Sequence, residues 1–129
     1  MREQEKLSKQ LENVIAFFRT VKQEYEYDYG QVGEQDKLKC DLLHSIELTD
    51  VDYATRCKTA TKLRKCLKTR RYYKDMVEER KAIVDFLNKT ENKRIFDALA
   101  KVLGDTRTVE RYHKNRSYTP RIEKMSVLV

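Results

Sequence analysis

The first part of the chain carries apolar residues in alternating steps of three and four, which places them on one face of an α-helix. The pattern resumes beyond Gly30 and Gly33 with no proline between its two parts. Each glycine costs about 1 kcal/mol relative to alanine inside a helix, so this stretch is the weakest part of the pattern. We predict a continuous or bent helix over about residues 3–47, with this apolar face: Leu7, Leu11, Val14, Ile15, Phe18, Val21, Tyr25, Tyr29, Val32, Leu42, Leu43 and Ile46.

The segment LTDVDY, which begins at Leu48, carries several signals of a helix start. Thr49 is the expected N-cap, Asp52 is the capping-box acid, and Leu48 with Tyr53 forms the expected hydrophobic staple. We therefore predict a second helix over residues 50–88, with a buried face made of Leu63, Cys66, Tyr73, Met76, Val77, Ile83, Val84 and Leu87.

A third helix is predicted over residues 91–104, capped by Thr90 and ended by Gly104 in a left-handed conformation. A continuation to residue 115 is the alternative, because apolar positions recur beyond the glycine. Pro120 disfavours helical angles at the preceding residue, so we expect an extended basic tail over residues 117–129. The apolar stripe of this helix comprises Ile95, Phe96, Leu99, Val102 and Leu103.

These segments predict an all-α protein. The chain has 129 residues, 3 glycines and 1 proline, which suits a single domain made of long helices. Its content of charged residues is 38%, well above the usual quarter, which is typical of thin helices with large solvated faces. We expect one domain over residues 1–116, an elongated antiparallel helical hairpin with a third helix in a three-helix-bundle-like arrangement.

Charge is distributed unevenly along the chain. The net charge is +7, but residues 1–52 hold 7 Lys and Arg against 12 Asp and Glu, while residues 53–129 hold 21 against 9. A tight turn near Thr49 would bring residues whose numbers sum to about 98 to the same height in the hairpin. This register places acidic residues beside basic ones in four pairs: Glu24 with Lys74, Asp28 with Arg70, Glu34 with Arg64, and Asp36 with Lys62.

The basic stretch at residues 57–76 therefore has two interpretations, internal charge pairing or contact with phosphates. Pairing inside the hairpin is favoured, but it cannot use every cation. Lys58, Lys62 and Lys65 form one helical stripe. Arg64, Lys68 and Arg71 form another, and the two stripes cannot both face the first helix. The candidate partner contacts on this segment are Lys58, Lys62, Arg64, Lys65, Lys68, Arg71 and Tyr72.

Aromatic residues accompany the cations in two places. Tyrosines at 25, 27 and 29 with Tyr72 and Tyr73 are expected to pack within the hairpin, where Gly30 and Gly33 would allow close approach, leaving Tyr27 and Tyr72 on its outer sides. Near the C-terminus, Arg and Lys are interleaved with Tyr and His, a composition able to contact phosphates and stack on bases. The candidate contacts there are Arg107, Arg111, Lys114, Arg116, Tyr118 and Arg121.

Signals for catalysis, metals or cofactors are weak. Cys40 and His44 share a helix face and only Cys57 is well placed to join them, which is short of the four ligands of a zinc site. We find no glycine-rich phosphate loop and no scaffold for an activated cysteine, so we expect no enzyme activity, cofactor or metal. Three cysteines without CxxC spacing, and no apolar run long enough to span a bilayer, favour a reduced, cytoplasmic setting.

Two blocks of sequence resemble a known group of proteins. These are KTRRYYKDMVEERKAIVDFLN, starting at Lys68, and VERYHKNRSYTPRI, starting at Val109. They are similar to small, largely uncharacterised early-region proteins of phages and prophages of Gram-positive, streptococcal-type bacteria. This resemblance covers roughly residues 40–122 and implies an accessory binding protein, such as an anti-CRISPR or other anti-defence inhibitor, in the cytoplasm of the bacterial host.

We therefore expect a non-enzymatic phage protein that binds and modulates a host or phage nucleoprotein machine. The first alternative is a basic nucleic-acid-binding protein of phage replication or recombination. The second is a homo-oligomeric helical assembly protein, because a thin hairpin leaves apolar surface uncovered. A membrane partner is not expected.

Overall fold

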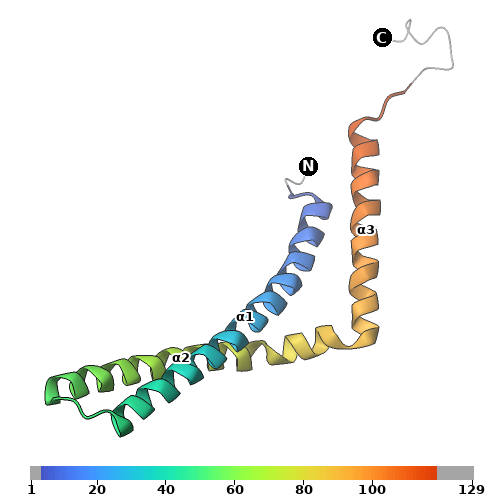
Figure 1. Cartoon of the computed structure of the whole chain (residues 1–129). Coiled ribbons are helices and arrows are strands. Elements are labelled where there is room, and N and C mark those ends of the chain that lie inside the picture. The colour runs from blue at the N-terminus through green and yellow to red at the C-terminus, as the bar shows by residue number, and fades with distance from the viewer. Residues whose placement is uncertain (1–3, 119–129) are drawn as a thin grey trace, which may run out of the picture.

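The computed structural model describes residues 4–118 and consists of three helices, α1 (Leu7–Leu48), α2 (Tyr53–Asn88) and α3 (Thr90–Lys114). α1 and α2 form a long antiparallel hairpin, and α3 turns away from the end of α2 to lie beside the start of α1 (Figure 1). The prediction of an all-α fold built on an antiparallel hairpin is confirmed. The tail was predicted over residues 117–129, and all of it beyond residue 118 lies outside the described residues.

α1 runs through both glycines without a break. Neither Gly30 nor Gly33 has a positive φ, and a Cβ added at either would meet no atom within 4 Å. The expectation that these glycines permit a close approach is therefore wrong. The helix persists because residues on either side of the glycines pack on α2, which outweighs the local cost of each glycine.

The corner of the hairpin differs from the predicted one. Asp52, and not Thr49, is the N-cap of α2, and its Oδ1 accepts a 2.9 Å hydrogen bond from the backbone N–H of Thr55. Thr49 instead ends α1, where its N–H donates to the carbonyl of Ser45. The predicted staple is also wrong, because the side chains of Leu48 and Tyr53 are both about three-quarters exposed.

Only one residue, Lys89, separates α2 from α3. Asn92 Nδ2 donates a 2.7 Å hydrogen bond to the carbonyl of Phe86 across this corner, which fixes the sharp change of direction. Thr90 is the first residue of α3 and not its cap, since Lys89 is the N-cap residue. Gly104 does not end the helix, so the longer of the two predicted versions of α3 is correct.

Most of the buried apolar residues lie where the three helices meet, whereas Cys66 is buried further along the hairpin, beside the backbone of Gln35. Phe18 of α1 packs edge-to-face on Phe96 of α3, with ring centroids 4.8 Å apart. Such pairs stabilise a core beyond the area that they bury. The buried apolar residues of the described chain are Ile15, Val21, Cys66, Val84, Leu87 and Leu103.

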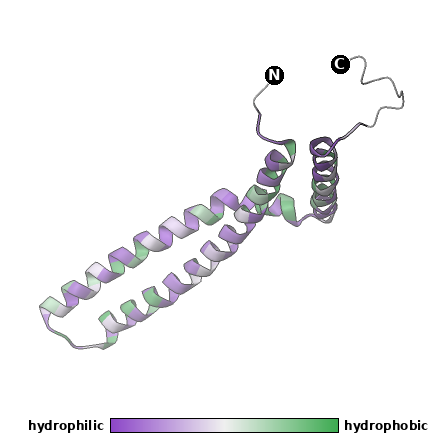
Figure 2. Ribbon diagram, turned by 90° about the horizontal axis from the view of Figure 1, so that it is seen from above, coloured by the Kyte–Doolittle hydropathy of each residue, from purple (hydrophilic) through white to green (hydrophobic). Residues whose placement is uncertain are grey.

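The far end of the hairpin, from Leu38 on α1 to Lys65 on α2, has no buried residue in the structure. Figure 2 shows apolar and polar residues mixed along both helices there. A two-helix layer without a third element cannot enclose its apolar stripe. Leu43 and Ile46, predicted for the buried face, are consequently exposed. Other residues predicted for buried faces are exposed elsewhere on α1 and α3: Leu7, Val14, Tyr29, Ile95 and Val102.

Within residues 4–118, the structure has no helix that is both long and apolar enough to cross a membrane.

Candidate nucleic-acid interface

The charge pairs inside the hairpin involve two arginines of α2. Arg80 donates from Nη1 to Asp28 Oδ2 at 3.0 Å and from Nη2 to Glu24 Oε2 at 2.8 Å. Arg70 pairs through Nε with Asp36. Asp28 is buried, so its bond to Arg80 compensates for the loss of water around the carboxylate.

None of the four predicted pairs is formed. Asp28 and Asp36 each bind an arginine further along α2 than the predicted partner, and Glu34 binds Lys37 of its own helix at 3.3 Å. The register differs because the corner is wider than the assumed tight turn: Thr49 to Asp52 all lie outside the helices. Internal pairing therefore exists, but it uses different residues.

This arrangement leaves the predicted contact residues of α2 on the outside. Their side chains are all exposed, and none joins an ion pair with another described residue: Lys58, Lys62, Arg64, Lys65, Lys68 and Arg71. We call these six residues the α2 cationic face. Acidic residues that would have neutralised them under the predicted register are held elsewhere.

Helix geometry explains why Lys68, Arg64 and Arg71 stay outside. At 100° per residue, Lys68 points almost directly away from Cys66 and Tyr73, which face α1. Arg64 and Arg71 lie on one side of this direction and Lys65 lies on the other. Lys62 precedes Cys66 by one turn and so lies near the α1 side of the helix, where it stays exposed because this end of the hairpin buries no residue. At 1.5 Å per residue the face extends over about 20 Å along α2.

A row of three tyrosines adjoins this face. The rings of Tyr27 and Tyr73 are 6.3 Å apart at 75°, and those of Tyr73 and Tyr72 are 5.4 Å apart at 71°. Tyr73 is half-buried between the helices, and the outer two rings are exposed, as predicted. Desolvation, and then the neighbouring hydroxyl of Tyr27, raises the pKa of Tyr73 above its usual value.

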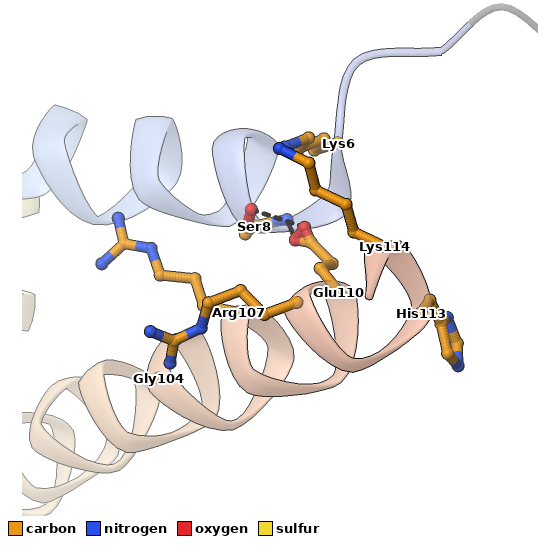
Figure 3. Close-up of a pocket in the computed structure, with 8 residues that line it drawn as sticks. Lys6, Ser8, Gly104, Arg107, Glu110, His113 and Lys114 are labelled. Carbon is orange, nitrogen blue, oxygen red and sulfur yellow. Dashed lines mark hydrogen bonds between the residues drawn. The ribbon is translucent and has the colours of Figure 1, made fainter. Parts of the chain in front are cut away.

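The C-terminal candidates lie around a pocket of about 940 Å³ between the start of α1 and the end of α3. Arg107, Arg111 and Lys114 line it, together with Lys6 (Figure 3). Arg107 is engaged by Glu12 of α1 at 3.0 Å. This group is therefore partly neutralised, unlike the α2 cationic face.

Glu110 lines the pocket and joins its two helices. Its Oε2 accepts a 2.8 Å hydrogen bond from the hydroxyl of Ser8, and its Oε1 accepts a 3.3 Å bond from the Ser8 backbone N–H (Figure 3). A carboxylate at the first turn of α1 also suits the positive end of the helix dipole. Sequence reasoning missed this contact, because no local pattern links residues 102 positions apart.

The remaining C-terminal candidates lie beyond the pocket. The guanidinium of Arg116 stands 5.7 Å from the ring centre of Tyr112, a cation–π distance. Tyr118 is exposed, and Arg121 lies outside the described residues. The two predicted groups do not form one surface, because the start of α2 and the end of α3 lie at opposite ends of the molecule (Figure 1).

The three cysteines lie in different environments, since Cys40 and Cys57 are exposed and Cys66 is buried. Cys40 Sγ lies 3.9 Å from His44 Nδ1, as the predicted spacing implied, while buried Cys66 donates to the carbonyl of Gln35 at 3.3 Å. Among residues 4–118, no group of three or more His, Cys, Asp and Glu is placed to hold a metal ion.

The geometry thus offers a row of cations without an acidic partner among residues 4–118, beside exposed aromatic rings on a long helical hairpin. In comparisons with known proteins, the chain matched no protein-family model, no curated protein and no solved structure.

Proposed function

We propose that this protein is a non-enzymatic phage accessory protein that attaches to a nucleoprotein assembly by binding its nucleic acid along the α2 cationic face. One observation carries this proposal: six exposed cations of α2 have no acidic partner among residues 4–118, although the adjacent helix is rich in Asp and Glu. Phosphates are the abundant ligands for such a row of Lys and Arg.

Binding through the α2 cationic face should weaken with salt concentration in a predictable way. Each phosphate neutralised by a protein cation releases a condensed counterion, so affinity falls steeply as salt is added. If all six cations engage, the slope of log affinity against log salt is about −4 to −5. Three engaged cations would give a slope of about −2, and a slope near zero would mean that the contact is not made through this face.

A charge-reversal variant with a matched control tests the location. The first variant is Lys62→Glu, Lys65→Glu and Lys68→Glu. The control is Lys89→Glu, Arg94→Glu and Lys101→Glu, three exposed positions that change the net charge by the same amount. Fluorescence anisotropy with labelled 30-nucleotide DNA and RNA should show loss of binding in the first variant only.

Two outcomes contradict the proposal. Equal loss in both variants would indicate attraction by bulk charge rather than by the α2 cationic face. Absence of binding by the unmodified chain to every nucleic acid at about 20 mM salt would remove direct nucleic-acid contact altogether.

The target is proposed to be a host or phage nucleoprotein machine, as an anti-CRISPR or other anti-defence inhibitor in the bacterial cytoplasm would require. Support comes from the resemblance of two sequence blocks to phage early-region proteins. Capture from a streptococcal lysate by the control variant, but not by the charge-reversed variant, would support it. Nuclease treatment that leaves capture unchanged would argue for a purely protein contact.

The C-terminal group would supply a second, weaker contact. Arg111 and Lys114 are exposed at the pocket, whereas Arg107 is already paired with Glu12. The double substitution Arg111→Glu and Lys114→Glu should therefore weaken anisotropy-measured binding less than the variant of the α2 cationic face. An equal or larger loss would make the end of α3 the principal contact.

A second candidate function, self-association, is favoured by the outer side of α3. Ile95, Val102 and Val109 recur every seven residues and are each about half exposed. β-branched residues at this spacing suit a two-stranded coiled coil. Light scattering at about 100 μM should then give twice the chain mass, falling to one chain with Val102→Glu, whereas a monomeric unmodified chain would exclude this candidate.

A further inference from the structure

The three-tyrosine row has a geometry that simple core packing does not explain. Tyr27 comes from α1, and Tyr72 and Tyr73 come from α2, with each neighbouring pair of rings edge-to-face. Despite these contacts, the side chains of Tyr27 and Tyr72 remain 61% and 58% exposed. The half-buried Tyr73 thus holds two rings in defined positions at the surface, which lowers the entropy that a stacking partner must remove.

The exposed rings continue a row of lysines. Lys58, Lys62, Lys65 and Tyr72 are separated by four, three and seven residues, which keeps all four on one stripe of α2. The distance from the first lysine to the tyrosine is about 20 Å along the helix axis. A ligand that follows this stripe meets positive charge first and an aromatic surface next.

This order of groups fits one class of ligand. A single strand presents phosphates along its backbone together with unpaired bases, whose faces are free to stack on aromatic side chains. A duplex presents the same phosphates, but its base faces are covered by the neighbouring pairs. A protein surface with acidic side chains would use the lysines and leave the tyrosine row without a defined role.

We propose that the α2 cationic face binds single-stranded nucleic acid, with phosphates along Lys58, Lys62 and Lys65 and bases stacked on Tyr72 and Tyr27. This inference rests on the proposed function and adds the substrate class. Stacking of one base on an aromatic side chain changes affinity by about tenfold, so a single strand should bind about 10- to 100-fold more tightly than a duplex.

Competition and fluorescence test the proposal on the full chain. Anisotropy is measured with a labelled 20-nucleotide single strand of DNA, the same length of RNA, a 20-base-pair duplex, and polyphosphate as a polyanion without bases. The chain has no tryptophan and 8 tyrosines, so tyrosine emission can be followed without tryptophan background. Binding of a single strand should quench part of this emission, and polyphosphate should not.

Matched variants locate the effect. Tyr72→Leu should lower single-strand affinity about tenfold and reduce the quenching, while polyphosphate binding stays unchanged. Tyr72→Phe keeps the ring and should retain the affinity. Tyr53→Leu is the control, since this tyrosine is also exposed but lies at the start of α2, away from the row.

The outcomes separate this inference from the function on which it rests. Equal affinity for single strand and duplex, with no effect of Tyr72→Leu, would overturn the inference and leave the cationic contact standing. No binding to any nucleic acid at low salt would overturn both. Circular dichroism of each variant shows whether helix content is retained, and Tyr27→Leu gives a second removal of the platform from the other helix.

Discussion

The two ends of the hairpin are built from similar helices but are stabilised very differently. Where α1, α2 and α3 meet, side chains such as Ile15, Leu87 and Leu103 are buried. At the other end, Leu38, Leu43 and similar residues remain exposed, because only two helices are present. The comparison shows that a third helix, more than apolar content, decides where most of the core of this chain lies.

The largest effect should come from the junction. Leu87→Ala removes a buried side chain and leaves a cavity, so we expect the free energy of unfolding to fall by about 2–4 kcal/mol. The same truncation at the thin end, Leu43→Ala, should cost less than about 0.5 kcal/mol. Urea denaturation followed by circular dichroism measures both, and equal losses would contradict the contrast between the two ends.

The second-largest effect concerns the ion pairs between α1 and α2, in the middle of the hairpin. Arg80→Met keeps the length of the side chain but leaves buried Asp28 without its cation, which should cost about 2 kcal/mol of unfolding free energy. Arg71→Met, on the outward side of the same helix, is the control and should have little effect. Similar stabilities for the two variants would show that Asp28 does not depend on Arg80.

A stabilising change is expected in the middle of α1. The double variant Gly30→Ala and Gly33→Ala places two methyl groups in open space, so the free energy of unfolding should rise by about 1–2 kcal/mol. The melting temperature should increase accordingly in a thermal scan. If the double variant were less stable, α1 would need the glycines for its backbone conformation, which would contradict this prediction.

The smallest effect is local to the hairpin corner. The hydrogen bond from Thr55 lowers the pKa of the Asp52 carboxyl. Since the folded-state pKa is depressed, the stabilising contribution is present above the ordinary pKa near 4 and is lost as pH falls through the lowered pKa. Protection from hydrogen exchange at the start of α2, after correction for the intrinsic rate at each pH, should fall over that range. Asp52→Ala should abolish this pH dependence while leaving protection at the junction unchanged.

Much of the fold was predictable because the signals are local. The spacing of apolar residues around Ile15 and Val84 repeats every three or four positions, and this repeat alone indicates helices and their inward sides. Helix ends were less predictable, since Thr49 and Asp52 are both good capping residues and only the backbone geometry selects between them.

The sequence also indicated the cationic stretch and its exposed tyrosine partners. It did not indicate which cations would lack an acidic partner within the described part of the chain, residues 4–118. That result depends on the width of the corner, which set Arg70 beside Asp36 and Arg80 beside Asp28 instead of the expected partners. A pocket residue such as Lys6 was missed because its neighbours come from the other end of the chain.

By itself, therefore, the sequence determined three amphipathic helices, their antiparallel pairing and a concentration of positive charge on the second. Only the tertiary structure decided the register, the position of the core at the three-helix junction, and the freedom of the α2 cationic face. The physical reason is one of range: helix periodicity is set by neighbours three or four residues away, whereas the contact between Ser8 and Glu110 joins residues 102 positions apart. Such contacts depend on how the corners between α1 and α2, and between α2 and α3, orient whole helices.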